Sequence, residues 1–344
     1  MYVNIQKEER LWISKQNSTA PECPFLRRDP YREVFVMLNN VSCLLSPELI
    51  ATICRLGHGD TIVLADGSFP SSSIAKEGGV KLICADGHGI PELLEEILKL
   101  LVLDTYADTP VMLMDKVACD ANKDIPIWRK YRSIIGRYDE RKNQAIGCYE
   151  RFEFYEQAKK AYCIIKTGET SGYANIILQT RGARRLKTWS KDTAGIPGIL
   201  SAELTAALCE MGHGDTIVLG DGNFPACSIA RARGAKLIRA DGHSIPELLD
   251  AILLLMPLDT YVDTPVILMD KLPCDENMSI PVWEDYRRIV GNYDARGQKA
   301  IGRRERFEFY EHAKNACCIV QTGETSVYAN IILQKGVVKA FLKK

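Results

Sequence analysis

The sequence lacks three features that would point to a partner or a compartment. Its 344 residues carry 44 basic and 44 acidic side chains, so no excess of positive charge is present to attract nucleic acid or an anionic membrane. It has no run of 18 apolar residues that could span a bilayer. The N-terminal stretch MYVNIQKEERLWISK is charged where a secretory signal would be apolar. The sequence therefore predicts a cytoplasmic protein with neither a nucleic-acid nor a membrane partner.

The motifs of nucleotide and metal sites are absent as well. The chain contains neither G-x-G-x-x-G nor G-x-x-x-x-G-K-[ST], and its five histidines and twelve cysteines show no metal-ligand spacing. Within residues 56–181 and their repeat, only Cys119/Cys274 and Cys163/Cys318 occupy matching places. A disulfide framework would be expected to recur with the domain, so we predict free thiols in a reducing compartment and no metal site.

The sequence does contain a long internal repeat. Residues 56–181 recur at 211–336 with a constant shift of 155 positions and no gap, so that GHGDTIVLADGSFP (57–70) returns as GHGDTIVLGDGNFP. A repeat of this length is a whole domain and not a solenoid unit. Polar residues that match in both copies become candidates for function.

Composition and the repeat together predict the domain boundaries. We expect a poorly ordered N-terminal extension at 1–36, because it has no counterpart in the second copy and no periodicity. A first domain should cover 37–181 and a second 195–344. The basic, non-periodic stretch 182–194 is predicted to be a linker.

Strands and helices alternate within each copy. Ser46 and Pro47 are typical of a helix start, and apolar residues with helical spacing predict another helix from Ile90 to Leu101. Short apolar runs predict buried strands. The alternation predicts an α/β fold, a three-layer α/β/α sandwich duplicated in tandem. The other predicted helices cover 125–138 and 150–162, and the predicted strands cover 61–65, 81–85, 111–114, 163–166 and 176–179.

The most informative candidate for acid–base chemistry is His58, with His213 as its copy. Glycines on both sides remove bulk and permit unusual backbone angles, so a ligand could approach the imidazole closely. Asp60 would be a natural orienting partner. A histidine of this kind can both give and take a proton near neutral pH. The alternative is a Gly-His-Gly loop with a purely structural role.

Other polar residues suit the binding of hydroxyl groups. Asp66 ends a predicted strand, although Asp-Gly after a strand is also common in turns. Arg151 begins a predicted helix, where the helix dipole disfavours a cation, so an anionic or hydroxyl-rich partner is one reading and a solvated arginine the other. Tyr173 and Asn175 would face the same side of an extended segment, which suits a polyhydroxylated ligand, and the alternative is a turn with no binding role.

In order along each copy, GHGD, ADGxFP or GDGxFP, LDTY, ERFEFYE, TGET and YxN resemble the L-fucose mutarotase family, in the group that includes D-ribose pyranase. The resemblance runs through both copies and leaves out residues 1–36 and the linker. Leu56 precedes GHGD in the first copy where the family has Met, and His88 and His243 stand where Leu is usual. Arginine in ERFEFYE resembles the fucose branch more than the ribose branch.

The resemblance implies a cofactor-free isomerase that interconverts the α and β anomers of L-fucose by ring opening and closing. It implies His58 and His213 as the proton-transferring residues. It further implies sites near subunit contacts, so we expect the two halves to pack as an intramolecular pseudo-dimer that could assemble further. The open alternatives are a non-catalytic monosaccharide-binding module and a pyranase for ribose-like sugars. The implied sugar-binding residues are Asp66, Arg151, Tyr173, Asn175, Asp221, Arg306, Tyr328 and Asn330.

Overall fold

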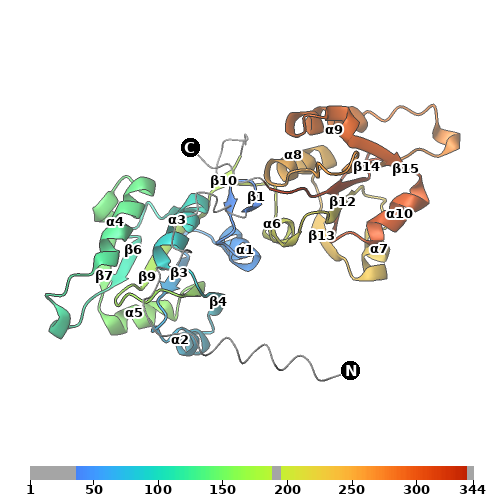
Figure 1. The fold of residues 1–344 in the computed structure, drawn as a ribbon. Coiled ribbons are helices and arrows are strands. Elements are labelled where there is room, and N and C mark those ends of the chain that lie inside the picture. The colour runs from blue at the N-terminus through green and yellow to red at the C-terminus, as the bar shows by residue number, and fades with distance from the viewer. Residues whose placement is uncertain (1–35, 188–194, 339–344) are drawn as a thin grey trace, which may run out of the picture. The chain divides into compact units, whose positions relative to one another are not determined.

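The computed structural model describes residues 36–187 and 195–338. The sequence predicts a poorly ordered extension at 1–36; residues 1–35 lie outside the described residues, and Val36 begins a strand. Most of the proposed linker also lies outside the described residues. Within the described part, each copy of the repeat forms its own mixed β-sheet with helices on both faces (Figure 1). The predicted duplicated three-layer α/β/α sandwich is therefore confirmed.

The sheet of the first half has the strand order β4-β8-β3-β9-β6-β7, with β5 pairing the far end of β9. Strand β9 is antiparallel to its neighbours β3, β5 and β6, and the other pairs are parallel. The strands are β3 (Thr61–Ala65), β4 (Lys81–Ala85), β5 (Leu101–Leu103), β6 (Val111–Met114), β7 (Ile146–Tyr149), β8 (Cys163–Thr167) and β9 (Ile176–Ala183). The helices are α1 (Pro47–Arg55), α2 (Ser71–Gly78), α3 (Ile90–Leu100), α4 (Pro126–Tyr138) and α5 (Arg151–Ala158).

The second half repeats this topology in the order β13-β16-β12-β17-β14-β15. Strand β17 is the antiparallel member. The strands are β12 (Thr216–Gly220), β13 (Lys236–Ala240), β14 (Val266–Met269), β15 (Ile301–Arg304), β16 (Cys318–Thr322) and β17 (Ile331–Gln334). The helices are α6 (Ala202–Glu210), α7 (Ala226–Arg233), α8 (Ile245–Leu255), α9 (Val282–Tyr293) and α10 (Arg306–Lys314).

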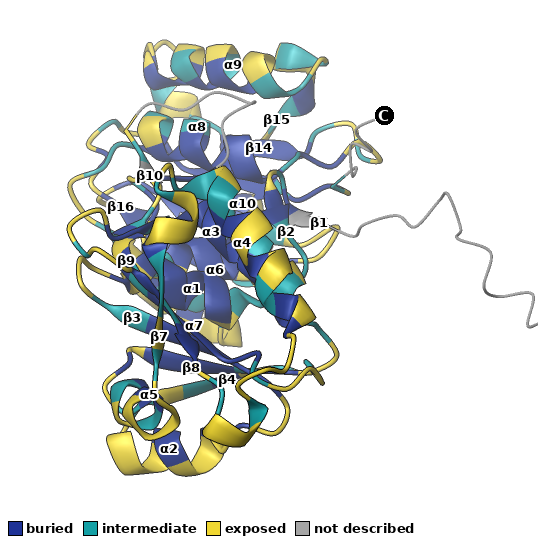
Figure 2. Ribbon diagram, turned by 90° about the vertical axis from the view of Figure 1, so that its left-hand side faces the viewer, coloured by how far each residue is buried: buried dark blue, intermediate teal, exposed yellow. Residues whose placement is uncertain are grey.

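Alternation along the strands divides each core into two layers. In the first half, Ile62 and Leu64 face the core layer of α1, α3 and α4, whereas Val63 and Ala65 face α2 and α5. The strands are buried along most of their length, while the outer side of α2 is exposed (Figure 2). Helices thus cover both faces of the sheet. The loops at the two ends of the strands remain for a site, and these two rims are called the edges of the sheet below.

Three predicted strands, 61–65, 81–85 and 111–114, match β3, β4 and β6 residue for residue. Helix α2 was not predicted, because its sequence SSSIAKEG is rich in serine, a mediocre helix former. Strand β7 was also missed: it lies at the sheet margin and is not fully buried, so it lacks a continuous apolar run.

The end of the first half is more regular than a linker. Strand β9 continues to Ala183, and β10 (Arg185–Leu186) pairs in parallel with β11 (Ile196–Pro197). The segment 182–194 therefore begins with paired strand residues. A hairpin of β1 (Val36–Leu38) and β2 (Val41–Ser42) precedes the first helix.

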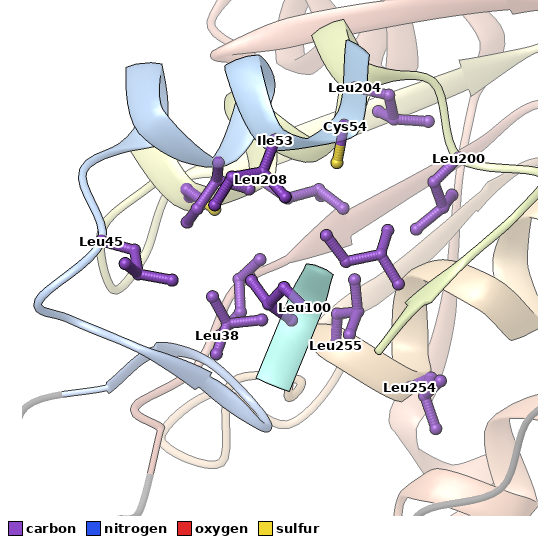
Figure 3. Close-up of a cluster of buried hydrophobic side chains, with 14 of the residues drawn as sticks. Leu38, Leu45, Ile53, Cys54, Leu100, Leu200, Leu204, Leu208, Leu254 and Leu255 are labelled. Atoms are coloured by element: carbon purple, nitrogen blue, oxygen red, sulfur yellow. The ribbon is translucent and has the colours of Figure 1, made fainter. Parts of the chain in front are cut away.

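Helices α1 and α6, which are equivalent in the repeat, pack against one another. Their contact joins the cores of the two halves in one apolar cluster (Figure 3). The amide of Asn39 donates to the Leu255 carbonyl at 2.7 Å beside it. Cys54 and Cys209, just outside the stretch compared above, are a further matching cysteine pair and are buried here. Equivalent residues in the cluster include Leu45 and Leu200, Ile53 and Leu208, and Leu100 and Leu255.

Candidate functional site

The His58 loop connects α1 to β3. Gly59 adopts a left-handed φ of 86°, which a side chain would disfavour, and the Asp60 carboxylate accepts the Gly57 amide at 2.7 Å. Asp60 thus fastens the backbone of the loop. The expectation that Asp60 orients His58 is wrong, because another carboxylate occupies that position.

That carboxylate is Asp104, which follows strand β5. His58 Nε2 lies 3.1 Å from Asp104 Oδ2, with the imidazole 57% exposed and the carboxylate buried. Because a carboxylate only accepts, this contact places the ring proton on Nε2 and leaves Nδ1 with the lone pair in the neutral ring. The pair therefore presents a solvent-accessible imidazole that is held in place by a buried carboxylate.

Further hydrogen bonds hold Asp104 in its charged form. The Tyr106 amide donates to Oδ1 at 2.8 Å, and Gln179 Nε2 donates to Oδ2 at 3.1 Å. Burial opposes ionisation, but the Tyr106 bond and the charge of His58 outweigh it, so the pKa of Asp104 lies below its ordinary value. Asp104 belongs to the repeated LDTY motif. Its recurrence in both copies was the signal that could have singled it out.

The second half builds the same group. His213 Nε2 lies 3.2 Å from Asp259 Oδ2, and Gln334 donates to that oxygen at 3.0 Å. The Tyr261 amide donates to Asp259 Oδ1 at 2.8 Å. The equivalence shows that the His–Asp pair is a feature of the domain and not of one loop.

An arginine braces each of these loops from outside. Arg141 donates to the carbonyls of Ala107 at 2.5 Å and Asp104 at 2.8 Å, while Asp139 pairs with its guanidinium. Arg296 makes the same contacts in the second half. The carboxylate beside each histidine therefore sits on a fixed loop.

Asp66 and Asn175 lie together at the other edge of the sheet. Asn175 Nδ2 donates to Asp66 Oδ2 at 2.8 Å, and the Asp66 amide donates to Asn175 Oδ1 at 2.9 Å. Burial raises the pKa of Asp66, although these bonds and the Ser68 amide oppose the rise. Asp221 and Asn330 repeat the pair, with bonds of 2.9 and 2.8 Å.

Tyr173 departs from the extended segment that the sequence predicted. Its φ is 59°, in the left-handed region, so the alternation expected for Tyr173 and Asn175 does not apply. Its hydroxyl donates to Asp120 Oδ2 at 2.7 Å, and its carbonyl accepts from Trp128 Nε1 at 2.8 Å. Tyr328 has a φ of 57° and its hydroxyl likewise bonds Asp275. The same turn thus lies two residues before the asparagine of the Asp–Asn pair in both copies.

Arg151 and Arg306 begin α5 and α10 at this same edge. Each guanidinium lies over the neighbouring phenylalanine ring, at 4.8 Å for Phe152 and 4.9 Å for Phe307. Arg306 Nε is buried and has no hydrogen-bond partner. Such a donor is ordinarily satisfied by water or by a bound molecule.

Tyr310 connects this arginine with the carboxylate and was not predicted as a site residue. Burial raises the pKa of Tyr310, with the charges of Arg306 and Asp221 acting on it in opposite directions. Its ring also contacts Phe224 edge-on at 5.8 Å. Asp221, Asn330, Arg306 and Tyr310 therefore share one neighbourhood.

The two groups of predicted residues lie at opposite edges of each sheet. His58 precedes strand β3 and Asp66 follows it. Five residues of strand extend about 16 Å at ~3.3 Å per residue. A monosaccharide cannot touch both ends at once. The structure thus brings Asp66 and Asn175 together, but it does not bring them to the histidine of the same domain.

Cavities in the second half do not change this division. One of about 350 Å³ lies beside the Asp221 edge, and another of about 450 Å³ lies at the start of α6. Neither is lined by His213, Asp221, Arg306 or Asn330. Within the described ranges, no three His, Cys, Asp or Glu side chains are placed to hold a metal ion. No helix in those ranges is suited to crossing a membrane.

The class of protein is a duplicated α/β domain with a His–Asp pair at one end of the sheet and an Asp–Asn pair at the other. The chain belongs to the RbsD / FucU transport protein family, whose model matches residues 39–181 and 194–338. The resemblance to the family that includes fucose mutarotases and ribose pyranases is thereby confirmed.

Each curated relative matches a stretch about as long as one copy of the repeat. Human fucose mutarotase is 51% identical over 146 residues, which are 42% of this chain and 93% of the relative. The L-fucose mutarotase of Haemophilus influenzae is 39% identical over 146 residues, 42% of this chain and 95% of the relative. Both relatives are named as fucose mutarotases.

One solved structure is also similar to this chain over a length close to that of one repeat copy. The structure titled as the fucose mutarotase of Streptococcus pneumoniae in complex with L-fucose is 50% identical. The match covers 42% of this chain and 97% of that one, with a TM-score of 0.38.

Proposed function

We propose that this chain is a mutarotase that interconverts the α and β anomers of L-fucose. The observation that carries the proposal is the His58–Asp104 pair, repeated as His213–Asp259. It occurs in a chain whose relatives are named fucose mutarotase. An imidazole that is exposed on one side and held by a buried carboxylate on the other suits proton transfer to and from a sugar.

The reaction needs a proton delivered to the ring oxygen and another removed from the anomeric hydroxyl. The ring then opens, the aldehyde rotates, and the steps reverse to close the other anomer. His58 Nδ1, the nitrogen that Asp104 leaves available, would take the proton from the anomeric hydroxyl and return it to the ring oxygen. One positioned general acid–base typically contributes about 10²–10⁴-fold to the rate. The proposed chemistry asks for no cofactor.

The Asp66 edge would hold the sugar hydroxyls. Asp66 and Asn175 present a carboxylate and an amide that already bond each other, so both are fixed before a ligand arrives. In the second half, Arg306 Nε has no hydrogen-bond partner among the described residues and would donate to a sugar hydroxyl. Tyr173 and Tyr328 would complete the rim of their sites. These assignments of Asp66, Arg151, Tyr173, Asn175 and their copies are proposals.

A complete site requires two different domains, since each domain carries its two groups at opposite sheet edges. The halves of one chain meet through α1 and α6, which cover sheet faces and not the edges. We therefore propose that the histidine edge of one chain meets the aspartate edge of a second copy. The α1–α6 contact supports the further proposal that the two halves form an intramolecular pseudo-dimer.

Saturation-transfer NMR tests the function directly. Irradiating one anomeric proton of L-fucose should reduce the signal of the other faster with the protein than without it. Acceleration with ribose but not fucose would favour the ribose-type pyranase instead. Sugar binding without any acceleration would favour a non-catalytic module. The cytoplasmic location stays a prediction, to be checked by fractionation of cells that express the chain.

A further inference from the structure

Tyr106 and Tyr261 are exposed in a way that the folding of the chain does not require. Their side chains are 76% and 78% exposed, the highest values for large hydrophobic residues in the part of the chain that the structure describes. They occupy equivalent positions in the two halves. A large aromatic side chain normally contributes by being buried, so the same exposed ring in both copies points to a contact outside the domain.

Each ring stands beside the proposed acid–base residue. The Tyr106 ring lies 5.4 Å from the His58 imidazole with the planes tilted by 58°. Tyr261 lies 5.3 Å from His213 with a tilt of 62°. At these distances the two rings of each pair contact one another, so a ligand on the exposed side of the imidazole would also lie beside the phenol ring.

The backbone beneath each ring is fixed. The Tyr106 amide donates to Asp104 Oδ1 at 2.8 Å, and Arg141 holds the carbonyls on either side of the tyrosine. The Tyr261 loop has the same bonds. A ring that is exposed on a rigid loop loses little freedom when a ligand lands on it, which favours binding.

L-Fucose matches this surface in its chemistry. It is a 6-deoxy sugar, so it carries a methyl group and C–H bonds on one side of a ring whose other positions are hydroxyls. The Asp66 and Arg151 edge offers polar groups for those hydroxyls, and its exposed rings, Phe152 and Phe307, already lie against the guanidinium groups of Arg151 and Arg306. Sugar sites combine a few polar groups with an apolar or aromatic wall, and the histidine edge has no other exposed aromatic ring contacting His58 among the described residues.

We propose that Tyr106 and Tyr261 bind the apolar face of the sugar, each forming one wall of the site beside its histidine. This inference rests on the proposed function and names the residue that recognises the deoxy-sugar surface. The ring contributes to binding and not to proton transfer. In the first half, Arg181 lies 5.9 Å from the Tyr106 ring and limits its movement, whereas Gly336 takes that place in the second half.

The test compares Tyr106→Ala/Tyr261→Ala with the matched variant Tyr106→Phe/Tyr261→Phe in the full chain. Exchange of L-fucose anomers is measured by saturation transfer over a range of sugar concentrations. Loss of the apolar wall should raise KM about tenfold with kcat within about twofold, because uniform binding is removed. The phenylalanine variant keeps the ring and should stay near the unaltered chain in both constants.

Three outcomes would overturn the inference. An unchanged KM in the alanine variant means that the rings do not touch sugar. An equal loss in the phenylalanine variant means that the hydroxyl matters and the ring does not. A lower assembly mass of the alanine variant by light scattering means that the rings are subunit contacts. If the unaltered chain shows no exchange at all, the proposed function fails and takes this inference with it, which is a distinguishable result.

Discussion

The two halves differ in one residue of the strand next to the histidine loop. In the first half, Thr180 Oγ1 donates to the Val102 carbonyl at 2.8 Å. In the second, Lys335 takes the place of Thr180 and is buried, and its Nζ donates to the carbonyls of Leu208 at 2.9 Å and Met211 at 2.6 Å. A neutral hydroxyl in one copy thus corresponds to a buried ammonium in the other.

The backbone around this position differs less than the side chains. The carbonyls of Thr180 and Lys335 both accept the glycine amide after the histidine at 2.9 Å. Strand β5 of the first half is reduced to a single bridge at Leu258, where Pro257 replaces Val102 and has no N–H to donate. The His–Asp distances nevertheless agree, at 3.1 and 3.2 Å. The geometry of the His–Asp pair therefore depends on the loops that carry it. The residues at the positions of Thr180 and Val102 can change without altering that geometry.

Removal of the histidines should cause the largest loss in the rate of anomer exchange. We expect His58→Ala and His213→Ala each to leave roughly half the activity, and the double variant to lose about 10²-fold or more. Saturation-transfer NMR measures all three rates. His88→Ala/His243→Ala is the matched control, since these histidines also recur but lie in another loop. Complete loss in one single variant would show that the halves are not equivalent.

Mixing two inactive chains should restore activity if edges from different copies meet. One chain carries His58→Ala/His213→Ala and the other Asp66→Ala/Asp221→Ala. After joint unfolding and refolding, a histidine edge from the second chain can meet an aspartate edge from the first. We expect exchange to reappear in the mixture but in neither chain alone. No recovery from a mixed assembly of correct mass would contradict the two-copy site.

Changing the carboxylate beside each histidine should have a smaller effect. Asp104→Asn and Asp259→Asn keep the shape but remove the charge that fixes the ring proton on Nε2. The loss of a hydrogen bond to a charged group costs about 1.5–3 kcal/mol, which is roughly 10–100-fold in rate. Rates of the two single variants show whether each half depends on its own pair. A Gln144→Ala variant, on the surface of the first half, is the control for folding.

The smallest expected effect concerns Lys335. Burial lowers the pKa of Lys335 below its ordinary value of 10.5. Between the two pKa values the unfolded chain binds the proton and the folded chain does not, so the stability of the protein rises with pH in that window. The gain is at most about 1.4 kcal/mol for each unit of pKa difference.

Lys335→Thr, which installs the residue of the first half, should lack this gain. Denaturant midpoints of the variant and the unaltered chain, measured from neutral pH up to 10.5, give the comparison. Thr180→Ser controls for a change at the equivalent place in the first half. If the difference between the two midpoints is the same at every pH, the ammonium does not titrate in this window.

The fold could be predicted because the repeat and the apolar runs are strong local signals. Strands such as Thr61–Ala65 are buried on both faces and bounded by glycine or aspartate, so their limits follow from composition alone. Helix α2 and strand β7 could not be found in that way, since their stability depends on tertiary contacts of a few residues and not on periodicity.

The site was predictable residue by residue but not as an arrangement. Asp66 and Asn175 are 109 positions apart, and only the antiparallel pairing of β3 with β9 brings them together. Asp104 lies in the repeated LDTY motif, but it is 46 positions from His58, so its contact with the histidine required the fold. The left-handed turn at Tyr173 likewise has no signal in a tyrosine, which rarely adopts that conformation.

The contact between α1 and α6 has a consequence for how this protein responds to dilution. Two separate single-domain chains that meet through such helices would dissociate as their concentration falls, and their folded fraction would fall with it. In this chain the partner helix is covalently attached, so the contact forms within one molecule at a fixed local concentration. Any contact between whole chains remains concentration-dependent, whereas the apolar seam of equivalent leucines between α1 and α6 stays closed in the most dilute solution.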